Sequence, residues 1–475
     1  MHKDNYFNKM GTEVLDFTFI KRWDRGRMRK VAMSYAFLLV LTVFFLSSVS
    51  SWAVIYISNI EELQKIGNDS AYPLDGEYEL TQDIDASDTV NWNDGAGFAP
   101  IGTDWLPFTG KFDGKGHKIT GLYINYLDTD YIGLFGYIDS GSEVKNVGLE
   151  NAMVSGGSYV GGLVGKNFLG TVSGCYSTGS VFGDWYVGGL VGENWYGTVS
   201  GCYSTGSVSG RYDVGGLVGG NGGTVSGCYS TGSVSGEYEV GGLVGSNEGM
   251  VNNSFAMGSV TGYIHDIGGL IGYLWSGSVT NTYSTGLVGG SGSNKGGLIG
   301  YIEASNNPTV TSSYWDTQTS GMNTSAGGEG KTTAEMKQQA TFIDWDFTDI
   351  WDIIEDSTYP WLKSLGQPQV PPPPVEKNIS SLEELNKIGR DIEYPWDGIY
   401  HLVNDIDASE TVNWEGGKGF KPIRVFTGKF YGQGHKIVNL YINRPDEGNV
   451  GLFDVLYGEV RDLGIENAMV SGGSM

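Results

Sequence analysis

Short alternations of apolar and polar residues recur along this chain with a nearly fixed period. The phrase Gly-Gly-Leu-(Val/Ile)-Gly occurs six times at intervals of 26 to 28 residues, and a second phrase, CYSTGSV at 175–181, recurs at 202–208 and 228–234. Such runs, bounded by glycine, are typical of β-strands joined by turns. The period predicts repeating units that bury their apolar faces against their neighbours. The six phrases begin at Gly161, Gly188, Gly215, Gly241, Gly268 and Gly296.

The unit length predicts an all-β fold, a parallel β-helix (β-solenoid) with short capping helices, in which each unit forms one coil. Successive coils then place equivalent residues in columns about 4.8 Å apart. Three cysteines share one column, and we expect buried thiols rather than a disulfide, which would leave one cysteine over. Another column holds four amides that we expect to form a structural hydrogen-bonded ladder. These residues are Cys175, Cys202 and Cys228, and Asn167, Asn194, Asn221 and Asn247.

The first 53 residues have the pattern of an export signal. A basic stretch, KRWDRGRMRK at 21–30, precedes an uncharged apolar run at 31–46 and the small-x-small sequence Ser51-Trp52-Ala53. Because no charged residue occurs from 31 to 60, an uncleaved membrane anchor is the alternative to a signal peptide. Both interpretations predict an exported protein, either extracellular or at the cell surface.

The rest of the chain divides at changes in pattern. A helix signal at 58–66, which opens with Ser58 and Glu61 spaced as a capping box, precedes the repeats. An aromatic-rich, non-repeating stretch follows them, and then a proline-rich run, QPQVPPPPVEK. ENAMVSGGS at 466–474 then copies 150–158 letter for letter. We therefore expect an N-terminal cap with the first coils at 54–131, a repeat array at 132–327, a C-terminal cap at 328–366, a linker at 367–378 and a second, truncated copy at 379–475.

The repeats and their companion phrases resemble the GLUG-motif family. The companion phrases are FTGKFDGKGHKI at 108–119, SYWDTQTSG at 313–321, WDF at 345–347 and YPWL at 359–362. The resemblance implies a β-helix of the pectate-lyase type, right-handed and extracellular. Proteins of this family include bacterial adhesins and the non-catalytic regions of immunoglobulin-A peptidases, so the resemblance implies no catalytic residues.

Residue patterns also favour a non-enzyme without a resident metal or cofactor. None of the five histidines forms H-E-x-x-H, and no G-x-S-x-G occurs. The alternative is a carbohydrate-active enzyme, a polysaccharide lyase or glycoside hydrolase, whose acidic residues would act on sugar. In the second copy, Tyr431 and Gln433 stand at the positions of Asp113 and Lys115. The Asp83 and Asp85 pair gives only a weak calcium signal. The candidate set is Asp83, Asp85, Asp113 and His117, with Lys115 or Lys118.

A binding surface is expected at the turn before each glycine phrase. Aromatic side chains there would form a strip beside an acidic strip of Asp213, Glu239 and Asp266, both exposed, and such a surface suits sugar rings and hydroxyls. The alternative is that the rings only stack on one another. The net charge of −25 argues against nucleic acid and against membrane contact outside the N-terminal segment. The candidate ligand-binding residues are Trp185, Tyr186, Tyr212, Tyr238 and His265, with Trp195, Tyr196 and Trp275 on the next turn.

These features predict a surface or secreted adhesion module whose partner is an extracellular glycan or a surface protein. Two other functions stay open. One is the carbohydrate-active enzyme, and the other is a structural spacer that displays a further, C-terminal domain.

Overall fold

The computed structural model describes residues 53–369, 374–391, 393–448 and 450–473. The predicted signal peptide or anchor at 1–53 lies outside this part of the chain, except for Ala53. Within the described residues, no helix is both long enough and apolar enough to cross a membrane.

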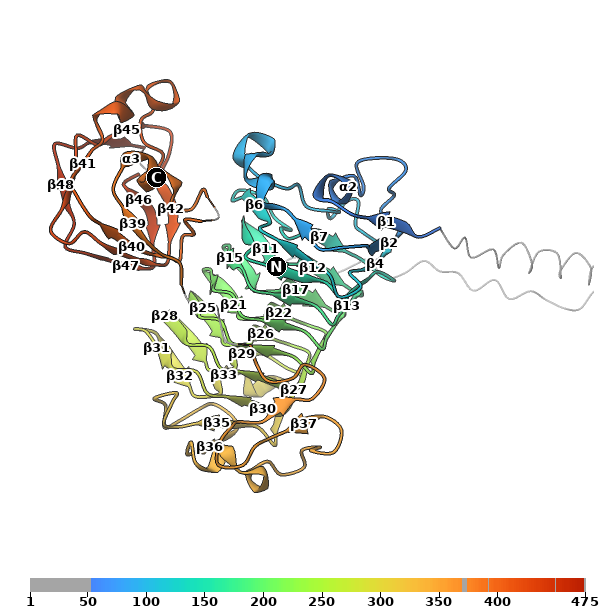
Figure 1. Cartoon of the computed structure of the whole chain (residues 1–475). Helices are drawn as coiled ribbons and strands as arrows, with labels where there is room; N and C mark the ends of the chain where they lie inside the picture. Colours follow the sequence, from blue (N-terminus) through green and yellow to red (C-terminus); the bar gives the residue numbers. More distant parts are fainter. Residues whose placement is uncertain (1–52, 370–373, 392, 449, 474–475) are drawn as a thin grey trace, which may run out of the picture. The chain divides into compact units, whose positions relative to one another are not determined.

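The first copy winds into a parallel β-solenoid whose coils contribute to three sheets (Figure 1). One coil runs through β10 (Met153–Gly156) and β11 (Ser158–Gly161) in an 11-stranded sheet, then β12 (Val164–Phe168) in a 7-stranded sheet, then β13 (Thr171–Ser173) and β14 (Tyr176–Ser177) in an 18-stranded sheet. The next coil repeats this order as β15 (Ser180–Phe182), β16 (Trp185–Gly188), β17 (Val191–Trp195), β18 (Thr198–Ser200) and β19 (Tyr203–Ser204).

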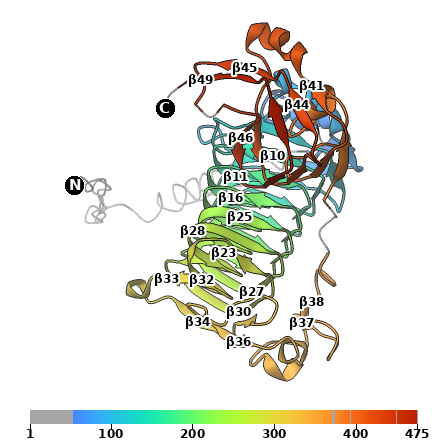
Figure 2. The same cartoon turned by 90° about the vertical axis from the view of Figure 1, so that its left-hand side faces the viewer.

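All strand pairs in these three sheets are parallel, and within the repeat array each strand pairs with its equivalent in a neighbouring coil. Thr171, Val172 and Ser173 pair with Thr198, Val199 and Ser200, for example. Figure 2 shows the resulting ladder of strands in successive coils. The predicted all-β parallel solenoid is therefore confirmed. The 7-stranded sheet contains β7 (Phe135–Ile138), β12, β17, β22 (Val218–Asn221), β26 (Val244–Asn247), β29 (Ile271–Leu274) and β33 (Ile299–Ile302).

The core consists of columns of medium-sized apolar side chains. Leu163, Val164, Val172 and Val187 are each fully buried, and so are their equivalents in the following coils until the last coil, where Lys295 and Val310 are part-buried. Branched side chains suit this stacking because they pack closely across adjacent parallel strands. The alternating residues between them face solvent, which explains the short two-residue pattern in the sequence.

Steric space at one corner explains the glycine phrase. The first glycine of each phrase ends a strand of the 11-stranded sheet, where the chain turns into the 7-stranded sheet. A Cβ atom at Gly215 would overlap the carbonyl oxygen of Val218, and the five equivalent glycines meet the equivalent oxygen. Glycine is needed here because the backbone approaches itself closely.

The asparagine column forms a continuous ladder inside the solenoid. Nδ2 of Asn167 donates to Oδ1 of Asn194 at 2.8 Å, Asn194 to Asn221 at 2.8 Å and Asn221 to Asn247 at 2.7 Å. All four side chains are buried. Ile138 precedes the ladder in register and Leu274 follows it.

The cysteine column also lies in the core. Cys175, Cys202 and Cys228 are free and buried. The amide of Cys175 lies 3.4 Å from Sγ of Cys202, and the amide of Cys202 lies 3.4 Å from Sγ of Cys228. They occupy the interior as small apolar side chains.

A short helix, α2 (Ile60–Gln64), lies at the N-terminal end, where it buries Ile60 and Leu63. The sequence pairs Ser58 with Glu61 as a capping box, and this pairing is wrong. Asn59 is the N-cap and accepts from the amide of Glu62, whose carboxylate returns to Ser58 at 2.9 Å. The helix therefore begins one residue later, because the Asn59 side chain competes successfully for the cap.

The residues of the predicted C-terminal cap at 328–366 cover a face of the array. Trp315 and Met322, which precede that segment, join the core that contains the last inward residues. Farther on, Phe342, Trp345 and Trp351 pack on aromatic residues from the outer face of the 18-stranded sheet. The sequence predicts only the covering of the open end. The outer aromatic residues are Tyr229, Phe255, Tyr283 and Tyr314.

The second copy has its own core and its own capping helix, α3 (Leu382–Lys387). Its strands include β40 (Ile399–Leu402), β43 (Lys429–Tyr431) and β47 (Glu459–Arg461), which pair in parallel. Ile465 in its last described coil is 48% exposed, whereas the equivalent Leu149 of the first copy is fully buried. The difference arises because a further coil covers Leu149.

Candidate binding surface

The predicted aromatic residues form one stacked column, which we call the aromatic column, on the 11-stranded sheet. Trp185 pairs in register with Tyr212, Tyr212 with Tyr238, and Tyr238 with His265. Ring centroids are 3.9 Å apart for Trp185 and Tyr212 and 4.5 Å for Tyr212 and Tyr238, with near-parallel planes. His265 meets Tyr238 edge-on at 4.8 Å.

Exposure differs along the aromatic column. Trp185 is 44% exposed, while Tyr212, Tyr238 and His265 are half-buried. Serine ends the column on both sides, since Ser158 precedes Trp185 in register and Ser293 follows His265. The middle rings therefore cover each other's faces, as the alternative interpretation of the sequence predicts. The outer face of Trp185 has only Ser158 beside it in the register.

The residue after each member of the aromatic column belongs to a second column. The sequence analysis identifies only part of this second column. Its members have left-handed backbone, with φ of 54° at Tyr186, 52° at Asp213, 48° at Glu239 and 63° at Asp266. This conformation redirects the side chains toward the 7-stranded sheet, where the Tyr186 ring lies so close to Gly220 that a Cβ there would sit 2.7 Å away. The prediction of an exposed acidic strip is wrong for Asp213 and Asp266, which are 8% and 7% exposed.

Two tyrosines extend this second column toward the N-terminus. Tyr131 stacks on Tyr159 at 4.8 Å, and Tyr159 stacks on Tyr186 at 5.1 Å. Nζ of Lys166 lies 4.9 Å from the Tyr159 ring centre and forms a 2.6 Å ion pair with Glu193. Tyr131 and Tyr159 are absent from the residues predicted from the sequence, although their spacing from Tyr186 could have identified them.

The acidic part of the second column is electrostatically strained. Burial, followed by repulsion from Asp213 and Asp266, raises the pKa of Glu239 to about 8. Burial also raises the pKa of Asp213 to about 6, and the carboxylates of Glu193 and Glu248 add to the shift. Carboxylates in successive coils lie too close to be ionised together without cost.

Some of these groups offer ligand atoms that could hold a cation. Donor atoms of Glu239, His265 and Asp266 lie within 4.8 Å of one another. Nδ1 of His265 lies 2.9 Å from Oδ2 of Asp266, and Oδ1 of Asp266 accepts from Asn294 at 2.8 Å. The acidic groups therefore already use two internal partners, and the sequence expectation of no resident metal stays a prediction.

The other predicted ligand-binding residues, Trp195, Tyr196 and Trp275, lie where strands of the 7-stranded sheet end. Trp195 ends β17, and Tyr196 and Trp275 occupy the following turns with exposures of 63% and 43%. Trp195 contacts Tyr196 edge-on at 5.2 Å and covers Gly222. They form no stack with the aromatic column in the described part of the chain.

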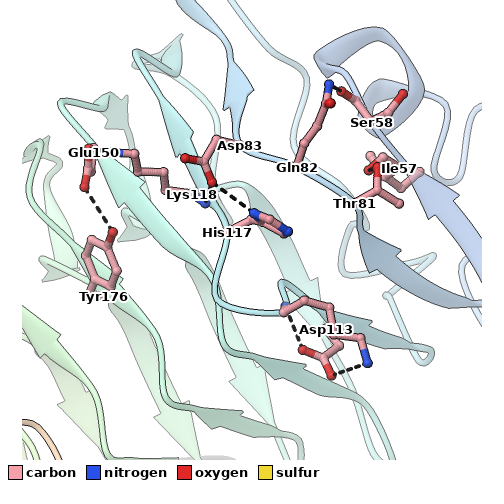
Figure 3. Close-up of polar contacts among 11 residues, drawn as sticks. Ile57, Ser58, Thr81, Gln82, Asp83, Asp113, His117, Lys118, Glu150 and Tyr176 are labelled. Carbon is pink, nitrogen blue, oxygen red and sulfur yellow. Dashed lines mark hydrogen bonds and ion pairs between the residues drawn. The ribbon is translucent and has the colours of Figure 1, made fainter.

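The candidate acidic residues near the N-terminal end are occupied by internal contacts (Figure 3). Oδ1 of Asp83 lies 3.1 Å from Nδ1 of His117 and accepts from the amide of Lys118 at 3.2 Å. Nζ of Lys118 pairs with Glu150 at 2.7 Å, and the Tyr176 hydroxyl donates to Glu150 at 3.1 Å. The Lys118 amide, then His117, hold the pKa of Asp83 below its usual value.

The other acidic residues of the candidate catalytic set, Asp85 and Asp113, cap turns. Asp85 accepts from the amide of Ser87 at 2.9 Å, and Asp113 accepts from the amide of Lys115 at 2.9 Å and from Asn146 at 3.1 Å. The second copy repeats the first network, with His435 at 3.3 Å and the Lys436 amide at 3.1 Å from Asp405. Repetition of the same contacts in both copies suits a structural role.

Comparison with known proteins agrees with the repeat pattern. Residues 156–181, 183–209 and 210–235 match the family model of the GLUG motif. Halomucin of Haloquadratum walsbyi is 44% identical over 132 residues, which are 27% of this chain and 1% of that protein. A candidate Gly-rich membrane protein of Evansella cellulosilytica is 37% identical over 94 residues, 19% of this chain and 11% of that one. The chain thus spans only a small part of these relatives.

One solved structure, a candidate immunoglobulin A1 protease from Bacteroides ovatus, superposes with a TM-score of 0.43 at 21% identity, covering 65% of this chain and 92% of that chain. The resemblance found in the sequence rests on the repeats themselves and is confirmed by the matches to the family model. This chain carries GLUG-motif repeats, stacked as coils of a parallel β-solenoid.

Proposed function

We propose that this protein is a non-catalytic repeat module at the cell surface or in the extracellular medium, and that it binds an extracellular glycan. The observation that carries the proposal is the aromatic column, which presents the 44% exposed Trp185 on a rigid array of parallel strands. Aromatic rings offer a flat apolar surface to the C–H faces of sugars.

The location is supported by the names of the relatives, a halomucin and a candidate Gly-rich membrane protein. The basic and apolar pattern of residues 21–46 agrees with export. A net charge of −25 keeps such a module soluble and disfavours contact with nucleic acid and anionic lipid.

The non-catalytic part of the proposal is supported by the contacts of Asp83 and Asp85. Backbone amides hold the pKa of both carboxyls below the usual value, whereas a general acid needs a raised pKa. Their hydrogen bonds to the chain itself suit turn capping better than sugar cleavage.

A glycan array probed with the purified protein, with and without calcium, tests this function. We expect saturable binding to one class of sugars, and we expect Trp185→Ala to weaken it. Trp105→Ala is the matched control, because Trp105 is 86% exposed on a different loop. A blank array on folded protein, or equal loss in both variants, would contradict the proposal and favour a spacer.

A further inference from the structure

The aromatic column stops abruptly at Trp185. One face of its ring stacks on Tyr212 at a centroid distance of 3.9 Å. The position next to its other face in the register belongs to Ser158. The four consecutive coils from Trp185 to His265 all carry a ring at this register position. The coil before them carries Ser158 instead, which leaves the space of one side-chain ring open beside Trp185.

The height of this space follows from the strand spacing. Adjacent coils are about 4.8 Å apart, and stacked rings need about 3.5–4 Å between them. A single flat ring therefore fits at the level of Ser158, in van der Waals contact with Trp185. A second ring does not fit at that level. We call this space the Trp185 slot.

Hydrogen-bond acceptors border the Trp185 slot on the side of Ser158, while the Arg211 guanidinium lies on the far side of Trp185, 5.1 Å from the Tyr212 ring centre. Asp130 lies at the same register position one coil farther from Trp185, and its Oδ1 accepts from the amide of Ser158 at 2.9 Å. Asp130 and Asp184 are both exposed, and Ser158 adds a hydroxyl. Carboxylate oxygens accept hydrogen bonds from sugar hydroxyls, and they repel an anionic sugar.

The opposite end of the aromatic column offers no equivalent space. His265 meets Tyr238 edge-on, and its Nδ1 is engaged by Asp266. Between the two ends, the rings cover one another. Trp185 is therefore the member of the column with both a free flat face and neighbouring hydrogen-bond acceptors.

We propose that the Trp185 slot is a subsite for one neutral pyranose ring, which stacks its C–H face on Trp185 and donates hydroxyl hydrogen bonds to the Asp130 carboxylate. The inference rests on the proposed function and specifies its ligand as a sugar without a carboxylate. The Asp130 carboxylate disfavours an anionic sugar at this position.

Filling the slot with a side chain tests this inference. Ser158→Tyr extends the aromatic column onto the free face of Trp185, so we expect a higher melting temperature together with a loss of binding. Ser293→Tyr adds a tyrosine beside His265 at the other end of the column and is the matched control, with unchanged affinity. Trp185→Leu keeps an apolar contact with Tyr212 but removes the flat face, and it serves if Ser158→Tyr does not fold.

Affinities would be measured by calorimetry with gluco-, galacto- and manno-hexaoses, with trigalacturonic acid as the charged probe and N-acetyltryptophanamide as the aromatic probe. We expect a neutral hexaose to bind, and Ser158→Tyr and Trp185→Leu to weaken it about tenfold or more.

A neutral hexaose that binds both variants as tightly as the parent protein would overturn the subsite but leave the proposed function standing. Failure of every sugar to bind folded protein would overturn both. Equal affinity for trigalacturonic acid would refute the neutral-sugar assignment, and binding of N-acetyltryptophanamide alone would replace the sugar by an aromatic side chain of a partner protein.

Discussion

Nδ2 of Asn194 donates a hydrogen bond to Oδ1 of Asn221 at 2.8 Å in the next coil, and both side chains are buried. Nδ2 of Asn194 also lies 3.2 Å from the carbonyl oxygen of Gly197 in its own turn. The amide thus joins two coils and closes one turn at once. Because water cannot replace these partners in the interior, the ladder fixes the register of the array.

Asn194→Leu should destabilise the protein by about 1–3 kcal/mol, because two buried groups each lose one of their partners. Nδ2 of Asn167 keeps only the Gly170 carbonyl, and Oδ1 of Asn221 keeps only the Gly223 amide. Asn167→Leu should cost less, since Oδ1 of Asn167 has no partner already and Ile138 lies beside it. Urea unfolding of the two variants checks the order. An equal loss of unfolding free energy in the two variants would contradict the argument that a central member of the ladder, bonded on both sides, stabilises the protein more than a terminal one.

Gly215→Ala should destabilise the fold by about 3 kcal/mol or more, because the new Cβ would overlap the carbonyl oxygen of Val218. Gly289→Ala is the matched control, since its Cβ would lie 3.9 Å from its nearest neighbour, the carbonyl oxygen of Val260. The control should be neutral or slightly stabilising. Similar melting temperatures for both variants would contradict the explanation that the first glycine of each phrase is needed because a carbonyl oxygen lies too close for a Cβ atom.

The period of the glycine phrase is enough to predict the fold, because each coil repeats the same contacts. Spacing alone also places Trp185 with Tyr212 and Asn194 with Asn221, since equivalent positions of a solenoid must stack. The direction of a side chain at a turn is harder to predict. A left-handed residue such as Asp213 departs from strand alternation, so its burial follows from backbone geometry that the sequence does not display.

The packing of the C-terminal cap is also beyond the sequence. The aromatic residues around Trp345 indicate a packed segment, but their partners come from strands far away in the chain, such as the one that holds Phe255. Tyr131 is a different case. It lies upstream of the six regular phrases, but its spacing of 28 residues from Tyr159 follows the period of the array and could have placed it in the second column.

Stability should fall as the pH rises through the range set by Glu239. The pKa of Glu239 is about 8 in the folded protein, against an ordinary value of 4.5. Between these values the folded state binds more protons than the unfolded state, so raising the pH favours unfolding. Glu239→Gln should therefore melt at a higher temperature than the parent protein near pH 9, with a smaller difference near pH 4.

Thermal melts of Glu239→Gln and the parent protein across this pH range provide the check. Glu239→Gln is compared with Glu237→Gln, in which the altered carboxylate pairs with Arg211 at 3.0 Å. A difference between Glu239→Gln and the parent that does not grow with pH would contradict the raised pKa of Glu239.

The thiols should be unreactive in the native protein. Cys175, Cys202 and Cys228 are free and at most 1% exposed, so a thiol reagent cannot reach them without unfolding. Ellman's reagent should detect no thiol in native protein and all three after denaturation without reductant. A count of one after denaturation would reveal a disulfide and refute the buried-thiol arrangement.

The most direct test of the account is the affinity of folded protein for neutral oligosaccharides, measured for the parent and for Trp185→Ala. The account predicts saturable binding by the parent and about tenfold or greater weakening in the variant, with little change in melting temperature because Trp185 is 44% exposed. Absence of binding by the folded parent, or undiminished binding by Trp185→Ala, would contradict it.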